Sequence, residues 1–227
     1  GFSGAGQGMC FVEPDETTLE QAAWDPQEQY IRSYVNQFGT ALNGANFTNP
    51  TTGYAAFLDV DRSIDHHMLN VLAMNVDALR LSTYLYKDRG GKLTFGPIWD
   101  FDRSMESTDG RDDNPSQWNG TGDGTIYFTS SSANIWWGRL FQDPNFWQKW
   151  IDRWQELRET TLSTAHMHAI LDSNRDELAE AAVRNFTRWS AAPPRGGSFA
   201  AEVTILKNWI ATRGNWIDGR FTRKATL

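Results

Sequence analysis

The chain of 227 residues lacks several features that would assign a protein to a familiar class. Cys10 is the only cysteine, so no disulfide can form within the chain. No apolar run approaches the roughly 18 residues that a membrane-spanning helix needs. The net charge is −7, so there is no excess of Lys and Arg to neutralise the phosphates of a nucleic acid. We therefore expect neither a membrane span nor a nucleic-acid partner.

Tryptophan, in contrast, is abundant, with eleven residues in the chain. Trp147, Trp150 and Trp154 are spaced i, i+3, i+7, which places the three rings on one face of a helix. Such a face usually packs against another helix, and we favour this interpretation. The alternative is an exposed platform on which sugar rings stack, as in a carbohydrate-binding module.

The pattern of apolar residues predicts a mainly α chain with one small β-hairpin, an α+β fold. Gly90 and Gly91 separate two β-rich runs, which is a typical hairpin signal. His66 and His67 are adjacent and point to different sides of a predicted helix, so they cannot share a metal, and we expect them at the helix surface or behind the residues of a site. The predicted helices are 26–43, 61–74, 134–142, 144–159, 163–186 (broken near Asp172) and 199–218, the strands are 83–87 and 92–98, and 103–134 is a long polar loop.

The segment from Asn75 to Arg103 carries the clearest candidate for chemistry. Asp77 follows a predicted helix, the hairpin comes next, and Asp100 and Asp102 lie at its far end. Protein-kinase-like enzymes use this order, in which one carboxylate accepts a proton and a later one holds a metal on a phosphate. In an extended Asp-x-Asp segment both side chains point to the same side, so both could reach one Mg²⁺.

Four stretches of the chain together resemble the CotH kinase family. The resemblance runs from about Glu13 to the C-terminus and implies the large helical lobe of a protein-kinase-like fold. Residues 13–227 would form this C-terminal lobe, with a Trp-rich helical part at 134–218, and residues 1–12 would be a linker or the end of a missing N-terminal lobe. The matching stretches are DVDRSIDHHMLN (59–70), NVDALRLSTYLYKD (75–88), GGKLTFGPIWDFDRS (90–104) and TDGRDDNP (108–115).

The resemblance implies Mg²⁺-dependent transfer of phosphate from ATP to Ser or Thr of a protein substrate. It also implies a secreted or cell-surface protein of a bacterial surface or coat. Asp77 matches the catalytic Asp of the family, and Asn75 is a second candidate, which would orient the catalytic loop. Asp100 is the first candidate for a metal ligand and Asp102 the second. Without an N-terminal lobe, the chain by itself would be a poor enzyme.

Two further positions enter through the resemblance. Many kinase-like loops carry a metal-binding Asn five residues after the catalytic Asp, whereas Ser82 stands at that position here. Its hydroxyl can ligate Mg²⁺ as a neutral and weaker substitute. The resemblance also places Glu13 where two kinase lobes join and where backbone groups meet the adenine of ATP.

Other interpretations stay open at the level of the sequence. Ser82 and the many Trp residues favour a non-catalytic surface module, either a pseudokinase or a carbohydrate-binding domain, whereas the intact pair Asp77 and Asp100 opposes it. A metal-dependent phosphodiesterase would use the same carboxylates. Acidic residues in 108–114 and 119–124 suggest a loose Ca²⁺ site, but both stretches lack the full calcium-loop pattern, and we favour a solvated loop.

Overall fold

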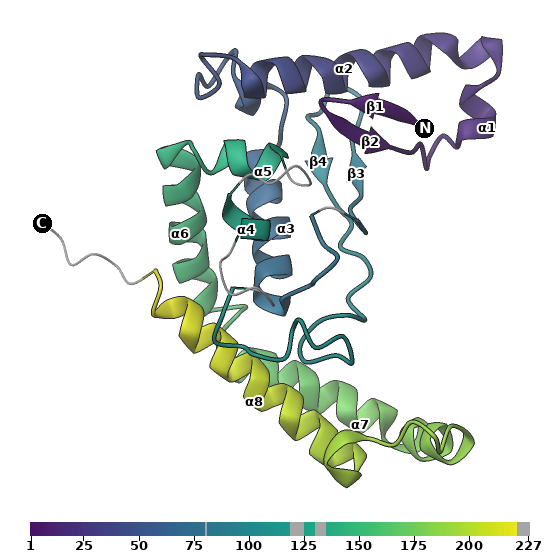
Figure 1. Cartoon of the computed structure of the whole chain (residues 1–227), viewed down its shortest axis with the longest axis vertical. Helices are drawn as coiled ribbons and strands as arrows, with labels where there is room; N and C mark the ends of the chain where they lie inside the picture. Colours follow the sequence, from purple (N-terminus) through teal and green to yellow (C-terminus); the bar gives the residue numbers. More distant parts are fainter. Residues whose placement is uncertain (80, 119–124, 130–134, 222–227) are drawn as a thin grey trace, which may run out of the picture.

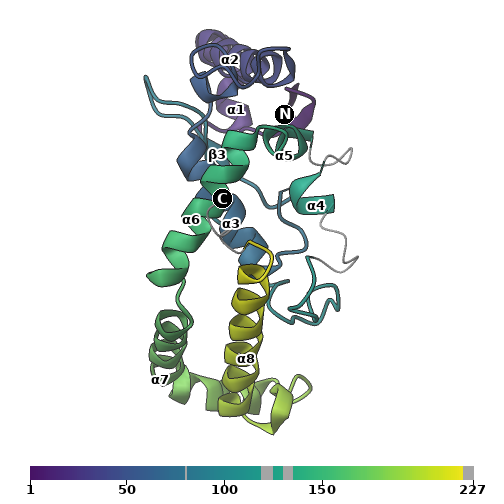
Figure 2. The same cartoon turned by 90° about the vertical axis from the view of Figure 1, so that its left-hand side faces the viewer.

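The computed structural model describes residues 1–79, 81–118, 125–129 and 135–221 and is mainly helical. Helix α2 (Asp25–Asn43) lies along one end of the molecule, and α3 (Val60–Ala73) passes through its middle (Figure 1). Helices α7 (Thr164–Arg188) and α8 (Phe199–Asp218) lie side by side at the other end (Figures 1 and 2). The described residues also form two antiparallel sheets of two strands each. The prediction of a mainly α chain with a small hairpin is therefore confirmed.

Residues 1–12 are expected to be a linker or the end of a missing lobe. In the structure they begin with a hairpin. Strands β1 (Phe2–Gly4) and β2 (Gln7–Met9) pair through a turn at Ala5 and Gly6, whose φ angles are 49° and 78°. Positive φ at both turn residues matches the twist of a tight hairpin. The carbonyl of Ala5 accepts a hydrogen bond from Trp136 Nε1 (2.8 Å), which ties the turn to the rest of the molecule. The hairpin packs on α2.

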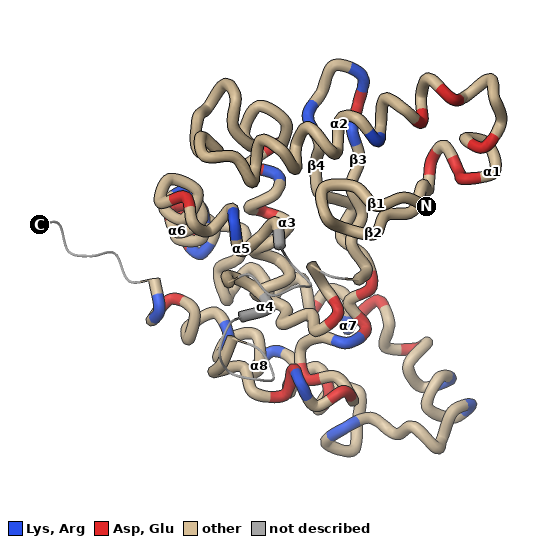
Figure 3. Tube along the Cα trace, turned by 45° about the horizontal axis from the view of Figure 1, so that its top comes forward, with Lys and Arg blue, Asp and Glu red and all other residues tan. Residues whose placement is uncertain are grey.

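Acidic side chains gather near this hairpin. Helix α1 (Glu16–Leu19), the 3-10 turn η1 (Ala22–Trp24) and the first turn of α2 lie in the acidic region (Figure 3). This end of the molecule therefore contributes strongly to the net charge of −7. The acidic residues here are Asp15, Glu16, Glu20, Asp25 and Glu28.

Most helix boundaries follow the sequence signals. The side chains of Asp59, Asp143, Ser163 and Ser198 accept hydrogen bonds from the first turns of α3, α6 (Pro144–Glu159), α7 and α8, as N-caps do. The helices expected at 26–43, 61–74, 134–142, 144–159 and 199–218 are confirmed, some with shorter ends. The elements not yet given are η2 (Tyr54–Ala56), α4 (Thr125–Phe128), α5 (Ile135–Leu140) and η3 (Arg195–Gly197).

Helix α7 runs without a break, so the predicted interruption near Asp172 is wrong. Asp172 Oδ1 accepts from Arg175 Nη1 (2.7 Å), and Asp172 Oδ2 accepts from Lys207 Nζ of α8 (2.7 Å). The carboxylate is therefore engaged along α7 and across to α8, and it does not compete with the helical backbone for hydrogen bonds. In the described ranges, every helix is either too short or too polar to cross a membrane.

The predicted hairpin is present but shorter than expected. Strands β3 (Leu85–Tyr86) and β4 (Thr94–Phe95) pair in antiparallel fashion. Leu93, just before β4, bridges to Leu58, just before α3, so the hairpin is attached to the segment that leads into α3. Of the predicted polar loop, residues 103–118 form turns without helix or strand, and α4 follows. Residues 119–124 and 130–134 lie outside the described residues.

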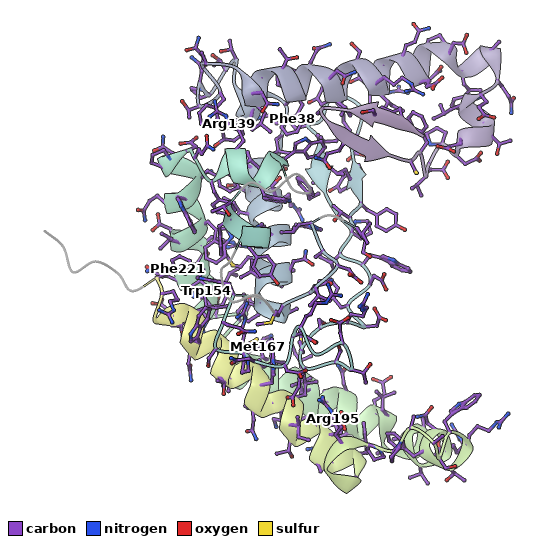
Figure 4. The ribbon with its side chains drawn as sticks, viewed as in Figure 1. Phe38, Arg139, Trp154, Met167, Arg195 and Phe221 are labelled. Carbon is purple, nitrogen blue, oxygen red and sulfur yellow. The ribbon has the colours of Figure 1, made fainter. Side chains whose placement is uncertain are left out.

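The tryptophan-rich face is a packed core, as the favoured interpretation predicted. The rings of Trp150 and Trp154 stack with centroids 6.0 Å apart, and both side chains are buried. Trp147 is partly buried and contacts Phe128 and Phe221. Figure 4 shows Trp154 on α6 and Phe221 in the chain that follows the neighbouring helix α8. Because the rings of Trp150 and Trp154 are enclosed, they cannot form a platform for a sugar.

His66 and His67 are buried, so the expectation that they lie at a helix surface is wrong. Helix α3 is packed against α6, α8 and β4, and these contacts cover the faces on which His66 and His67 lie. His67 Nε2 donates to the carbonyl of Tyr127 (2.8 Å), and its Nδ1 accepts from Trp150 Nε1 (3.1 Å). Burial lowers the pKa of His66 to about 4 and the pKa of His67 to about 3.

Candidate active site

The site begins where α3 ends. The helix stops because Met74 adopts a left-handed conformation (φ 51°), and the chain then leads into Asn75 and Asp77. The segment that follows β4 lies next to the end of α3. Met105 N–H donates to the carbonyl of Ala73 (3.0 Å), and Val76 N–H donates to the carbonyl of Arg103 (3.4 Å). The end of α3 and the second acidic segment are therefore neighbours.

The backbone around this meeting point is strained. Six of the seven non-glycine residues with positive φ in the described chain lie between 74 and 106. Such conformations cost free energy for most residue types, and they gather where a structure must aim particular side chains. The residues are Met74, Leu79, Ser82, Asp100, Met105 and Glu106.

Asn75 connects the two acidic segments directly. Its side chain is buried, its Oδ1 accepts from the backbone N–H of Asp77 (3.3 Å), and its Nδ2 donates to the backbone carbonyl of Asp100 (3.1 Å). One amide side chain thus links the backbone at Asp77 to the backbone at Asp100. Asn75 therefore binds the backbone of its neighbours and not their carboxylates.

Asp77 lies in a network of alternating charges. Arg103 Nη1 donates to Asp77 Oδ2 (2.8 Å), and Arg111 Nη2 lies 3.7 Å from Asp77 Oδ1. Asp109 binds both arginines: it accepts from Arg103 Nη2, from Arg111 Nε and from Arg111 Nη2 (2.9 Å). The side chain of Asp77 is 16% exposed, whereas the two arginines are 45% and 48% exposed. The carboxylate is therefore held from one side and open from another.

Asp100 and Ser82 are also brought together. The hydroxyl of Ser82 donates to Asp100 Oδ2 (2.9 Å), and no hydrogen bond to Asp100 Oδ1 is found among the described residues. Asp100 has a positive φ (63°), so Asp100 and Asp102 do not lie on an extended segment as we expected. Asp102 is exposed and, within the described ranges, forms no hydrogen bond or ion pair. The extended geometry that would direct both carboxylates to one metal ion is therefore absent, and Asp100 is the stronger candidate for a metal ligand.

The oxygen donors of this site fit Mg²⁺ better than a cation that needs a full protein cage. Among the residues that the structure describes, no group of three or more His, Cys, Asp or Glu side chains is placed to hold a metal ion. Mg²⁺ commonly takes one or two carboxylates, keeps several waters and completes its shell with phosphate oxygens. Asp100, with Ser82 beside it, would supply the protein part of such a shell.

Two sequence candidates lie apart from this group. Glu13 is exposed, precedes α1, and forms no bond with the site residues in the described part of the chain. In the stretch 108–114, considered as a loose Ca²⁺ site, Asp109 and Asp112 are engaged by other protein groups. Asp109 binds arginines, and Asp112 is buried and accepts from the backbone N–H and hydroxyl of Ser107 (2.6 and 3.0 Å). The other stretch, 119–124, lies outside the described residues.

Arg103, Arg111 and Asp109 are the residues that sequence reasoning missed. Arg103 directly follows the Asp-x-Asp motif, and Arg111 sits among the acids of 108–114. Their proximity to Asp77 depends on the path of the loop after β4, which no local pattern encodes. The one signal in the sequence that pointed to the two arginines was their position, since each lies beside an acidic motif.

A family model described as CotH kinase protein matches residues 12–217 of the chain. This range includes Asp77, Asp100 and every helix from α1 to nearly the end of α8. The match agrees with the resemblance inferred from the four sequence stretches. No curated protein matches the chain.

Proposed function

The chain belongs to the CotH kinase family, and from this premise we propose that it transfers the γ-phosphoryl group of ATP to a Ser or Thr hydroxyl of a protein. Mg²⁺ would accompany the nucleotide. The observation that supports this best is the buried Asn75, which holds the Asp77 backbone and the Asp100 backbone in one fixed arrangement. A phosphotransfer site depends mainly on such positioning.

Asp77 would act as the base that orients the acceptor hydroxyl. Its Oδ2 is occupied by Arg103, and its Oδ1 has no partner within hydrogen-bond distance among the described residues. Oδ1 is therefore the atom available to accept the proton of the acceptor. Asp100 would hold the metal, which neutralises the phosphate oxygens when it is bound.

The partner that we propose is a protein that presents Ser or Thr. We also propose that the protein works outside the cell or at the surface of a bacterium. Both proposals rest on the family resemblance, and an acceptor screen with surface or coat proteins is the direct way to test them.

A non-catalytic role is the second candidate, and two observations favour it. Ser82 replaces the Asn of many kinase-like loops, and its hydroxyl is already bonded to Asp100. Asp77 is likewise engaged by an arginine. A pseudokinase would keep this arrangement for nucleotide binding alone, without transfer.

Replacement of Asp77 separates these possibilities. We expect Asp77→Asn to lower the rate of phosphate transfer by about 10²–10⁴-fold, because the amide cannot accept the proton. The assay uses labelled ATP, Mg²⁺ and dephosphorylated casein as a generic acceptor, and it counts both phosphoprotein and free phosphate. Label that appears only as free phosphate would indicate hydrolysis rather than transfer.

The matched control is Asp113→Asn, which removes an exposed carboxylate from the neighbouring loop. This variant should transfer phosphate at the wild-type rate. Equal thermal stability of the two variants excludes a folding defect. A wild-type rate for Asp77→Asn would remove this residue from the mechanism.

A further inference from the structure

Arg103 binds two carboxylates of the candidate site and yet remains partly exposed. One arm of its guanidinium group is bonded to Asp77 Oδ2 (2.8 Å) and the other to Asp109, while 45% of the side chain is exposed. Its Nε forms no hydrogen bond with the described residues. A cation is therefore fixed beside the proposed base, with donor capacity left for a further anion.

Stability gives little reason for this arrangement. Although Asp77 and Asp109 are largely covered, 45% of the Arg103 side chain is exposed, so water screens its charge and lowers the contribution of these ion pairs to stability. The backbone at Asp77 is already fixed by Asn75, so Arg103 is not needed to place the loop. The network pairs two carboxylates with two guanidinium groups. Its net charge is therefore zero, so it does not repel an incoming phosphate.

The proposed reaction at Asp77 develops negative charge that a cation beside Asp77 would stabilise. In the proposed reaction the acceptor hydroxyl gives its proton to Asp77 Oδ1, and its oxygen forms a bond to the γ-phosphorus. The bond from that phosphorus to the bridging oxygen of ATP breaks, and ADP leaves with the electron pair. Negative charge is spread over the three equatorial oxygens of the group in transit, and an arginine supplied by the same chain is one way to stabilise it.

We propose that Arg103 is a second catalytic residue, which donates to the phosphoryl group in transit, and that Asp109 is the positioning residue that aims it. This inference rests on the proposed phosphotransfer function. Arg111 is the less favourable candidate, since it lies 3.7 Å from Asp77 and spends two of its donors on Asp109. Asp109 is only 7% exposed and binds both arginines, so it sets the direction of Arg103.

The test compares Arg103→Gln and Arg103→Lys with Arg89→Gln, an exposed arginine on the β3–β4 turn. We expect Arg103→Gln to lower kcat by about 10²–10³-fold, the usual effect of losing one donor to transition-state charge. The KM for ATP should change little. Arg103→Lys should recover part of the rate because it keeps the charge, and Arg89→Gln should match the wild type.

A second measurement reports on charge stabilisation without turnover. Calorimetry gives the affinity for Mg·ADP alone and for Mg·ADP with aluminium fluoride, which imitates the phosphoryl group in transit. Arg103→Gln should lose most of the gain in affinity that aluminium fluoride brings, and its affinity for Mg·ADP alone should stay at the wild-type value. Asp109→Asn should show the same pattern in weaker form.

The outcomes separate the two proposals. A full-length wild-type protein that neither transfers phosphate nor binds Mg·ADP would overturn the proposed function and this inference with it. An active wild type whose Arg103→Gln variant keeps its kcat would overturn the inference alone. So would an equal loss of affinity for Mg·ADP with and without aluminium fluoride, because that result indicates a structural role.

Discussion

At the scale of single residues, His66 is the most unusual buried group of the described chain. Both of its ring nitrogens are buried without a hydrogen-bond partner, and the ring packs against Phe95 with centroids 5.3 Å apart. Burial lowers its pKa from 6.5 to about 4, so the folded protein keeps His66 neutral while the unfolded chain protonates near pH 6.5. This pKa difference makes no contribution to the pH dependence above pH 6.5, and it lowers stability as the pH falls from 6.5 towards 4.

We therefore expect His66→Leu to make the protein less sensitive to acid. At pH 7 the free energy of unfolding should change by less than about 1 kcal/mol, because the lost ring left two polar atoms unsatisfied. At pH 5 the variant should be more stable than the wild type by about 2 kcal/mol, at about 1.4 kcal/mol for each pH unit below 6.5. Urea unfolding at both pH values measures this.

His166→Leu is the matched control, since His166 is exposed on α7. Its unfolding free energy should follow the wild type at both pH values. Parallel pH dependence of the wild type and His66→Leu would show that His66 is protonated in the folded protein. His67 is hydrogen-bonded at both ring nitrogens and remains in both proteins.

The residues of the candidate site differ in how far the sequence could predict them. Asp77 and Asp100 were predictable because carboxylates at that spacing around a hairpin form a known pattern. The bond from Ser82 to Asp100 and the double contact of Asn75 were not, because they depend on left-handed backbone at Ser82 and Asp100. The burial of His66 and His67 was missed because helical spacing alone does not reveal a helix that is covered on several sides.

At the scale of elements, Arg213 of α8 joins three parts of the molecule. The buried guanidinium donates to the carbonyl of Val71 near the end of α3 and to the carbonyls of Pro115, Gln117 and Trp118 in the loop after the site. Burial lowers its pKa to about 10, so it stays charged at neutral pH. A single side chain thus holds the end of α3, the 115–118 loop and α8 together.

We expect Arg213→Leu to destabilise the protein by at least about 3 kcal/mol, because each buried acceptor that loses its donor costs about 1–3 kcal/mol. The carbonyls of Val71 and of the loop would be left without their donor. Hydrogen exchange should show faster exchange in the 111–118 loop before the rest of the molecule unfolds. Urea unfolding gives the total change in stability.

Arg220→Leu is the comparison that isolates the buried bonds. Both arginines lie over the ring of Trp216, at 5.4 Å for Arg213 and 4.6 Å for Arg220, but Arg220 is exposed at the end of α8. Its loss should cost less than about 1 kcal/mol. If the two variants were equally destabilised, the ring contact rather than the carbonyl bonds would account for the effect.

Elements were predictable where a cap or a period marked them. Asp143-Pro144 and Ser198 mark the starts of α6 and α8, and both helices were placed correctly. The β1–β2 hairpin was missed because its strands have only three residues each, and alternating glycines leave no apolar period to detect. The continuity of α7 was missed because Asp172 pairs with Lys207 of the neighbouring helix α8, a contact that no local pattern encodes.

At the scale of the whole molecule, the candidate site depends on elements from both ends of the chain. Helix α3 carries the turn that presents Asp77, the β3–β4 hairpin returns the chain to Asp100, and α8 closes over the following loop through Arg213. A ligand held by Asp100 would therefore bind to an arrangement that the folded chain provides. Binding to the folded state alone stabilises it in proportion to the logarithm of the ligand concentration.

The final prediction uses this linkage to test the metal site. At 100 times the dissociation constant, Mg·ATP should add about 2.7 kcal/mol to the free energy of unfolding, which raises Tm by about 5–10 °C in a protein of this size. ATP with EDTA should produce little of this rise. Asp100→Ala should remove the Mg²⁺-dependent part, because the metal loses its protein carboxylate, and calorimetry should show the same loss of affinity. Asp102→Ala, the matched neighbour, should lower it less, since Asp102 is exposed and away from Ser82. Equal shifts in the wild type and Asp100→Ala would mean that Mg²⁺ is held elsewhere. A larger loss in Asp102→Ala would exchange the roles of the two carboxylates.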